Sequence, residues 1–453
     1  MFGTSGIRGA VGETVTCETA LSVGRALGSE GYDRVAVGRD ARDSGRMLAD
    51  ALAAGLRETG ADVVRLGMAA TPTIARSPGW VDADAAISVT ASHNPAPDNG
   101  LKFWTAAGHA FGPERQTAVA ERVRGDDYHL RPAGEGDLGE ETRSEGATRR
   151  HVEALVDGIE GTVESDDLTV VVDVGSGVGG LTADALRELG CAVHTLNAVP
   201  DGRFPARPSE PTAANCADLS ATVAATDADL GIAHDGDADR MMAVTADGTF
   251  LPGDVLLAVF ATEAAGEGDV VSAPVNTSLA VRDALAEVGA ELAYTRVGDG
   301  FVARHALEND AAFGGEMSGA WIWPGDAPCP DGPRAACRLV RLVGERGPLA
   351  DLAAAVPDYP TRRESHRVED KRDVIQRVGQ RIRNAEGEVD DRDGVRVDTD
   401  EGWYLVRASG TQPLVRLTAE ARSPEHSDEL MARARDHLEA ARPRERSPPG
   451  QEH

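Results

Sequence analysis

The sequence predicts an α/β protein of four domains: three similar domains with mixed α/β sheets and a smaller C-terminal α+β domain. Three segments repeat the same order of strand, polar loop, helix and second strand. The last part of the chain departs from this order and reads as antiparallel strands closed by a helix. At 453 residues the chain is also too long for one ordinary hydrophobic core.

The three repeated segments begin near residues 33, 168 and 268. Apolar runs such as VVVDV and DVVSA are typical of strands buried on both faces of a parallel sheet. A helix that joins two such strands implies a right-handed crossover. The segments share a pattern more than identical residues, and their spacing of roughly one domain length indicates a triplicated unit.

Breaks in the apolar pattern set the expected domain limits. The stretch AGEGDLGEETRSEG (133–146) has no apolar period, and VPDY (356–359) interrupts the pattern of the third domain. The final residues are rich in proline and charge, which is typical of disorder. The expected domains are 1–140, 147–247, 248–355 and 358–443, followed by a disordered tail at 444–453.

The charge balance is strongly acidic, with 46 Lys and Arg against 75 Asp and Glu and a net charge of −29. This charge has the wrong sign for holding nucleic acid or an anionic membrane. The chain has only two lysines, Lys102 and Lys371. An acidic, lysine-poor composition suits a protein kept soluble in concentrated salt, where self-repulsion is screened. We therefore expect a halophile's cytoplasmic protein; the alternative is a mesophilic protein of low pI.

The cysteines and the apolar runs predict an intracellular protein. Five scattered cysteines without a CxxC pair argue against a disulfide framework and against a structural zinc site. No signal segment is recognisable, and no run approaches the ~20 apolar residues of a membrane span.

Three aspartates at alternate positions, Asp235, Asp237 and Asp239, form the string AHDGDADR. In an extended segment alternate side chains point the same way, so these carboxylates are expected to converge. A hard divalent cation prefers such oxygen ligands, and Mg²⁺ is the first candidate. The small residues Gly236 and Ala238 let the chain turn tightly. The alternative is a solvated acidic loop.

A second cluster, VTASHNPAPDNGLKFW (89–104), follows a predicted strand and contains Ser92 and His93. No Ser–His–Asp triad is legible, because a histidine rarely reaches the hydroxyl just before it. A serine without a base suits phosphoryl transfer, where positioning and charge neutralisation matter most. Lys102 can lose its proton if its pKa is depressed, which arginine cannot do. A general acid/base role for Lys102 is therefore one hypothesis, and an ordinary loop lysine is the other.

Three further clusters concentrate polar groups in short turns. FGTSGIRG (2–9) offers backbone N–H groups and Arg8 to an anion. GGEMSGAW (314–321) pairs Glu316 with Ser318, which suits neighbouring sugar hydroxyls. RASGTQPLVR (407–416) offers phosphate donors in one turn and on the next strand: Arg407, Ser409, Gly410, Thr411 and Arg416.

Taken together and in this order, the five clusters resemble the α-D-phosphohexomutase family. This family contains phosphoglucomutases, phosphomannomutases and phosphoglucosamine mutases. The resemblance extends from Gly3 to about Ala441, and TASHNP, DGDADR, GEMSG and RASGTQP are each specific. It implies three similar α/β domains and a smaller C-terminal domain around a central cleft.

The resemblance also implies roles for individual residues. Ser92, beside His93, is phosphorylated in the active enzyme, and Arg8 and Lys102 flank the transfer. Mg²⁺ is held by a phosphoserine oxygen and by Asp235, Asp237 and Asp239. Arg240 lies beside the phosphoryl group, Glu316 and Ser318 bind sugar hydroxyls, and the phosphate that is not reacting is held by Arg407, Ser409, Gly410 and Thr411, with Arg416 close by.

The implied reaction moves a phosphoryl group between C6 and C1 of a hexose phosphate. Phosphoserine 92 donates to the free hydroxyl, and the resulting 1,6-bisphosphate turns over in the cleft and returns a phosphoryl group. A hexose 1,6-bisphosphate is the expected activator. The expected partner is a small hexose phosphate, without nucleic acid or membrane, and the protein is expected to be a monomer or homodimer.

Three departures from the family pattern bear on the substrate. Ala320 stands where many relatives carry His after GEMSG, and Gln412 replaces the usual Glu of the phosphate loop. Asp299 stands where glucose and mannose enzymes often show His, which resembles the phosphoglucosamine branch. We therefore expect glucosamine phosphate as substrate. Glucose or mannose phosphate remains an alternative, as do a phosphatase and a non-catalytic sugar-phosphate sensor.

Overall fold

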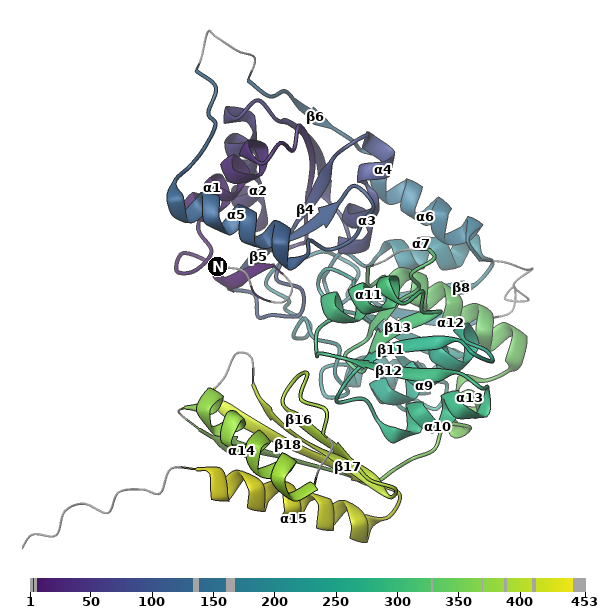
Figure 1. Ribbon diagram of the computed structural model, residues 1–453. Coiled ribbons are helices and arrows are strands. Elements are labelled where there is room, and N and C mark those ends of the chain that lie inside the picture. Colours follow the sequence, from purple (N-terminus) through teal and green to yellow (C-terminus); the bar gives the residue numbers. More distant parts are fainter. Residues whose placement is uncertain are drawn as a thin grey trace, which may run out of the picture.

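In the computed structural model, the residues that are described form four sheets, one for each domain, arranged in chain order (Figure 1). It describes residues 3, 6–132, 138–159, 168–326, 329–368, 370–386, 389–409 and 413–442. The predicted tail at 444–453 lies outside these residues. Within the part of the chain that is described, no helix combines the length and apolar character needed to cross a membrane.

Domain I contains a six-stranded mixed sheet of order β1-β5-β4-β2-β3-β6. Its strands are β1 (Ile7–Ala10), β2 (Arg34–Arg39), β3 (Asp62–Met68), β4 (Ala85–Val89), β5 (Asp98–Thr105) and β6 (Glu141–Arg143). Its helices are α1 (Cys17–Ser29), α2 (Gly45–Glu58), α3 (Thr71–Arg76), α4 (Pro78–Val81) and α5 (Pro113–Gly125). Strand β6 pairs with β3 and therefore extends this sheet beyond the predicted limit of residue 140.

Domains II and III each contain a four-stranded sheet, ordered β10-β9-β7-β8 and β12-β11-β13-β14. Domain II consists of α6 (Ala147–Asp157), β7 (Thr169–Asp173), α7 (Leu181–Glu188), β8 (Ala192–Leu196), α8 (Ala217–Ala224), β9 (Leu230–His234) and β10 (Met241–Thr245). Domain III consists of α9 (Gly253–Ala264), β11 (Val270–Pro274), α10 (Leu279–Glu287), β12 (Glu291–Thr295), α11 (Asp299–Glu308), β13 (Phe313–Glu316), β14 (Ala320–Ile322), α12 (Gly332–Arg346) and α13 (Leu349–Ala354).

The repeated unit forms as the sequence predicts. In each of the first three domains, the two strands of the unit pair in parallel and a helix connects them. These pairs are β2 with β3, β7 with β8, and β11 with β12. Domain I has its own apolar core, whereas domains II and III share one. Val170 and Ile232 of domain II belong to the same buried cluster as Leu257 and Trp321 of domain III. Burial of this shared surface joins the two domains firmly.

Domain IV contains an antiparallel sheet of order β15-β18-β17-β16, with two helices on one side (Figure 1). Its elements are β15 (Thr361–Arg367), α14 (Lys371–Glu386), β16 (Val395–Asp398), β17 (Gly402–Ala408), β18 (Leu414–Ala421) and α15 (Pro424–Ala441). The antiparallel strands and the closing helix were predicted, whereas β15 and α14 were not.

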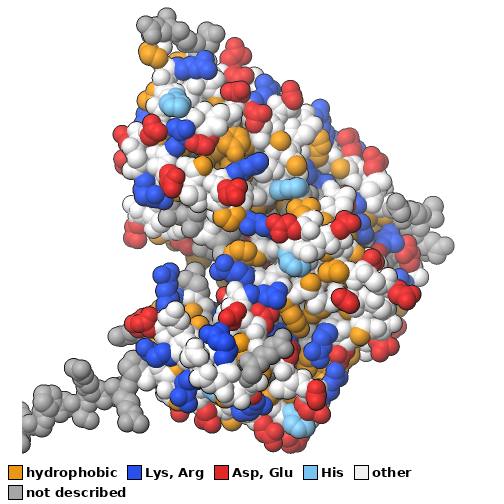
Figure 2. Space-filling model, in the orientation of Figure 1, with side chains coloured by type: hydrophobic (Ala, Val, Ile, Leu, Met, Phe, Trp, Pro, Cys, Tyr) orange, Lys and Arg blue, Asp and Glu red, His pale blue; other side chains and the backbone are white. Residues whose placement is uncertain are grey.

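Two side chains of domain IV fix it to the loop between β11 and α10. Arg396 is fully buried, donates to the carbonyl oxygens of Val275 (2.5 Å) and Thr277 (3.4 Å), and lies between two aromatic rings. Glu420 accepts the backbone N–H of Leu279 at 2.6 Å. Domain IV thus contacts domain III. The surface is hollowed between domains I and IV, with Lys or Arg side chains at its border (Figure 2).

Candidate active site

Ser92 and the acidic triad follow the carboxyl ends of β4 and β9, which is where open α/β sheets place their ligand sites. Ser92 is 1% exposed, and its φ of 53° lies in the left-handed region that a residue with a side chain rarely adopts. Its hydroxyl donates to Asp235 Oδ2 at 2.7 Å and lies 3.4 Å from Asp239 Oδ1. The loops of domains I and II therefore meet at this serine.

The three carboxylates converge, but they do so through a turn and not along an extended strand. Strand β9 ends at His234, and Ala238 has a φ of 59°. One ligand atom from each of Asp235, Asp237 and Asp239 lies within 4.8 Å of the others, and all three residues are buried. Alternation along a strand was therefore the wrong reason for the predicted convergence, because the left-handed residue redirects the chain between the aspartates.

Lys102 is the cation of this cluster. It lies on β5, only 3% exposed, and its Nζ donates to Asp237 Oδ2 at 2.9 Å and to Asp239. Burial lowers the pKa of Lys102, but Asp237 and Asp239 outweigh it and raise the pKa above its ordinary value. The depressed pKa expected for a general base is therefore absent, and Lys102 is held as a cation.

The surroundings shift the pKa values of the three carboxylates in opposite directions. Burial, reinforced by the charge of Asp237, raises the pKa values of Asp235 and Asp239. Burial opposes ionisation of Asp237 too, but Lys102 and the hydroxyl of Thr71 lower its pKa well below the usual range. Asp237 Oδ1 is buried, and no described residue forms a hydrogen bond with it. A divalent cation would satisfy this oxygen and favour ionisation of all three groups, so the residues fit Mg²⁺.

The serine loop is held by Arg42, which the sequence prediction did not include. Arg42 is fully buried and its Nε pairs with Asp40 at 3.0 Å. Its two terminal nitrogens donate to four backbone carbonyls of the loop, those of Ser92 (2.8 Å), Asn94 (2.6 Å), Pro95 (2.6 Å) and Asp98 (2.9 Å). All five N–H groups of the guanidinium are thus engaged, which no other side chain can reproduce.

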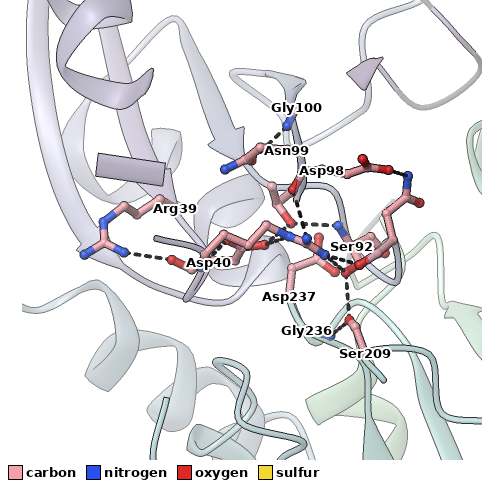
Figure 3. Close-up of polar contacts among 12 residues, drawn as sticks. Arg39, Asp40, Ser92, Asp98, Asn99, Gly100, Ser209, Gly236 and Asp237 are labelled. Atoms are coloured by element: carbon pink, nitrogen blue, oxygen red, sulfur yellow. Dashed lines mark hydrogen bonds and ion pairs between the residues drawn. The ribbon is translucent and has the colours of Figure 1, made fainter. Parts of the chain in front are cut away.

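Ser209 of domain II and Thr90 of domain I complete this support (Figure 3 shows Ser209 beside Ser92 and Gly236). The Ser209 hydroxyl donates to the Ser92 carbonyl and accepts from Gly236 N, both at 2.9 Å. The Thr90 hydroxyl accepts from Ser92 N at 2.9 Å and donates to Asp40 at 2.7 Å. In the sequence, the one signal for a role of Asp40 and Arg42 is the run GRDARDSG. This run is charged and connects a predicted strand to a predicted helix.

Three predicted residues lie around the serine and the triad. Arg240 donates its backbone N–H to Asp235 Oδ1 at 3.2 Å, and its side chain lies 3.7 Å from Glu210. His93 Nδ1 lies 3.5 Å from Ser92 Oγ, at the limit of a hydrogen bond. Arg8 lies on β1, and no described residue forms a hydrogen bond with its buried Nε.

Histidine 93 is neutral because its surroundings disfavour a positive charge. Burial and the nearby Arg240 and Arg8 guanidinium groups lower the pKa of His93 to about 3. Its imidazole can therefore accept a hydrogen bond beside Ser92 at neutral pH, but the lowered pKa makes it a weak proton acceptor.

Domain III contributes the predicted sugar-binding pair at the turn between β13 and β14. Ser318 donates to Glu316 Oε2 at 3.1 Å, and Glu316 Oε1 accepts Gly298 N at 2.6 Å. Burial raises the pKa of Glu316, and the charge of Asp299 raises it further. Asp299 begins α11, so two carboxyl groups of domain III lie near each other at this edge of the site.

The predicted phosphate clamp belongs to domain IV. Arg407 on β17 is the register partner of Arg416 on β18, and its Nη1 lies 3.6 Å from Asp393. Ser409 donates its N–H to Leu414 O at 2.8 Å and accepts Lys371 Nζ on its carbonyl at 2.5 Å. Gly410, Thr411 and Gln412 lie outside the described residues. Both lysines of the chain therefore lie in or beside predicted site clusters, Lys102 on β5 and Lys371 at the start of α14, although only Lys102 was predicted to contribute.

Family models for all four domains match the chain in this order. Phosphoglucomutase/phosphomannomutase alpha/beta/alpha domains I, II and III match residues 1–129, 149–248 and 252–359, and the C-terminal domain matches residues 365–437.

The chain belongs to this family.

Relatives of known name or structure cover nearly the whole chain. A probable phosphoglucosamine mutase of Methanopyrus kandleri is 45% identical over 95% of each chain. A probable phosphoglucosamine mutase of Methanococcoides burtonii is 41% identical over 97% of this chain and 99% of its own. A phosphoglucomutase/phosphomannomutase family protein from Burkholderia thailandensis has a crystal structure that matches with a TM-score of 0.86 and 30% identity, over 98% of this chain and 99% of its own. The chain thus has the complete domain set of a phosphohexomutase.

Proposed function

We propose that the protein is a Mg²⁺-dependent phosphohexomutase that interconverts glucosamine 6-phosphate and glucosamine 1-phosphate through a phosphoserine at Ser92. The observation that carries this proposal is the Ser92 hydroxyl, which lies 2.7 Å from Asp235 in a buried cluster of three carboxylates with one lysine. A serine held against a divalent-cation site by residues of two domains suits phosphoryl transfer better than acyl transfer.

In the first half of the reaction, the phosphoryl group leaves Ser92 Oγ and bonds to the free hydroxyl oxygen of the sugar monophosphate. The proton of that hydroxyl ends on Ser92 Oγ, which becomes the hydroxyl that donates to Asp235. The neutral imidazole of His93, 3.5 Å from Ser92 Oγ, can accept a hydrogen bond beside the transfer. Lys102 and Arg240 add positive charge around the transferred group. Bound Mg²⁺ would neutralise further charge on that group.

The second half reverses these bond changes at the other end of the sugar. The 1,6-bisphosphate reorients, returns one phosphoryl group to Ser92 and leaves as the isomeric monophosphate. Arg407 and Arg416, adjacent on neighbouring strands, offer two guanidinium groups to the phosphate that is not reacting. Hexose 1,6-bisphosphate acts as activator because it can phosphorylate an unmodified Ser92.

The amino sugar is favoured by the charge of the domain III edge. Asp299 and Glu316 lie close enough for Asp299 to raise the pKa of Glu316, and a 2-ammonium group between them would relieve this repulsion. Position 320, where many relatives carry His, is a buried alanine and offers no polar group to a glucose or mannose 2-hydroxyl. The archaeal relatives named as probable phosphoglucosamine mutases agree with this choice.

The decisive experiment compares three substrates by ³¹P NMR, with Mg²⁺ and a trace of hexose 1,6-bisphosphate. We expect glucosamine 6-phosphate to isomerise faster than glucose 1-phosphate or mannose 1-phosphate. Faster conversion of either neutral sugar would transfer the assignment to a phosphoglucomutase/phosphomannomutase. Release of inorganic phosphate alone would indicate a phosphatase, and no reaction would indicate a sugar-phosphate sensor.

The same assay tests whether the protein works in concentrated salt. The net charge of −29 and the replacement of all but two lysines by arginine support this adaptation. We expect the activity and the fraction of folded protein to increase between about 0.1 M and about 1 M KCl. Salt at the upper concentration screens the repulsion between surface charges. Equal activity at both salt concentrations would contradict it.

A further inference from the structure

The two oxygens of Asp237 have very different surroundings. Oδ2 accepts the hydroxyl of Thr71 at 2.7 Å and Lys102 Nζ at 2.9 Å. Oδ1 is buried, and no described residue forms a hydrogen bond with it. Leaving one oxygen of a buried carboxylate unsatisfied is costly. This asymmetry suggests that the protein reserves Oδ1 for a ligand.

Thr71 is itself fixed against Asp237 by two bonds. Besides the hydroxyl contact, its backbone N–H donates to the carbonyl oxygen of Asp237 at 2.9 Å. Thr71 begins the short helix α3, and its side chain is 1% exposed. A residue of domain I therefore holds both the main chain and the side chain of a domain II aspartate.

The other side of α3 is anchored in a buried cluster that joins three domains. Thr73 Oγ1 lies 2.8 Å from His151 Nδ1 of domain II, and His151 Nε2 lies 3.1 Å from Asp331 Oδ2 of domain III. Arg76, also on α3, donates to the same Asp331 oxygen at 3.0 Å. The helix that carries Thr71 is thus held at several points and cannot easily follow a movement of the aspartate.

We propose that Thr71 is a positioning residue that keeps Oδ2 of Asp237 turned towards domain I, so that Oδ1 is the oxygen that binds the divalent cation. The inference rests on the proposed function only in taking the acidic cluster as the cation site. The terminal torsion of an aspartate is broad, so hydrogen bonds must decide which oxygen faces the metal. Lys102 alone fixes the orientation of the Asp237 carboxylate poorly, because its Nζ also pairs with Asp239.

Loss of the Thr71 hydroxyl should therefore weaken cation binding without removing any ligand. Outer partners that orient metal ligands typically contribute about 10–100-fold in metal affinity. Because Thr71 and Asp237 belong to different domains, the affinity for the cation also depends on how domains I and II are aligned.

The test measures Mn²⁺ binding by electron paramagnetic resonance on unphosphorylated protein without sugar. We expect Thr71→Val to bind Mn²⁺ about 10-fold or more weakly than the wild type. Thr71→Ser retains the hydroxyl and should stay within about threefold of the wild type, which is well below the 10–100-fold loss expected when the hydroxyl is removed. Thr71→Ala is measured alongside and should match Thr71→Val, which covers the case in which valine prevents folding.

The matched control is Thr59→Val. Thr59 is also buried in domain I, and its hydroxyl donates to Leu56 O at 2.6 Å at the end of α2, away from the acidic cluster. This variant should lose stability but bind Mn²⁺ as the wild type does. Wild-type Mn²⁺ affinity in folded Thr71→Val or Thr71→Ala would overturn the proposal, as would equal weakening in Thr71→Ser. If these variants behave as expected but the wild type isomerises no hexose phosphate, only the proposed function fails.

Discussion

The guanidinium of Arg42 is predicted to control catalysis without touching the sugar. It uses five N–H groups, one for Asp40 and four for carbonyls of the serine loop. A lysine has three donors and keeps the charge beside Asp40, so Arg42→Lys leaves two carbonyls without a partner. Each unsatisfied buried group costs about 1–3 kcal/mol, so the folded loop should lose about 2–6 kcal/mol.

This destabilisation of the serine loop should lower mainly the rate of the chemical step, which kcat measures. Ser92 is held at a φ of 53°, and a loop that relaxes from this conformation moves Oγ away from Asp235. A displacement of about 1 Å can cost about 100-fold in rate, so we expect kcat of Arg42→Lys to fall by about that factor. KM for the hexose phosphate should stay within about threefold, because Arg42 lies beneath the loop and forms no part of the sugar site.

Arg334→Lys is the matched control for a buried arginine that binds backbone carbonyls. Arg334 is 4% exposed and donates to the carbonyls of Leu155 and Gly158, far along the chain from the serine loop. We expect this variant to unfold at lower urea concentration while kcat remains close to the wild-type value. Steady-state kinetics and urea denaturation separate the two effects. A folded Arg42→Lys enzyme with wild-type kcat would refute the reasoning.

Two further predictions concern charge in domain III. Burial raises the pKa of Asp254 to about 6, above its unfolded value of about 3.9, so the folded state binds the proton more tightly and stability falls as the pH rises between these values. In urea denaturation at pH 7.5, Asp254→Asn should therefore be more stable than the wild type by about 1–3 kcal/mol. At pH 3.5 this gain in stability should be absent, and equal differences at both pH values would contradict the prediction. Asp299→Asn should lower kcat/KM for glucosamine 6-phosphate at least about 10-fold more than for glucose 1-phosphate, because a charge-assisted contact is lost only with the amine. Equal losses for both sugars in steady-state kinetics would remove Asp299 from substrate selection.

The fold was predictable wherever the repeated pattern of strand and helix is strong. The parallel pairs of the first three domains follow from apolar runs such as VVVDV, which only a sheet covered on both faces can bury. Strand β15 has no such run: its sequence TRRESHR is charged, and none of its residues is fully buried. It lies at the edge of the domain IV sheet, where charged residues are typical and the alternating apolar pattern is absent.

The site was predictable where its residues are close in sequence. Ser92 and the three aspartates lie in short, polar, glycine-containing strings that stand out from their surroundings. Arg42, Thr71 and Ser209 do not, because their partners lie far away: Thr71 and Asp237 are 166 residues apart, and Ser209 and Ser92 are 117 apart. The raised pKa of Lys102 has the same origin, since it depends on carboxylates 135 and 137 residues further along the chain.

The most direct test of the account follows the phosphoryl group itself. Protein labelled with ³²P on Ser92 would be mixed with a small excess of unlabelled glucosamine 6-phosphate and quenched after a single turnover. The account predicts that label leaves the protein and appears first in the sugar bisphosphate and then in glucosamine 1-phosphate, while Ser92 takes up the unlabelled phosphoryl group of the substrate. Label that stays on Ser92 while the sugar isomerises, or that appears only as inorganic phosphate, would contradict it.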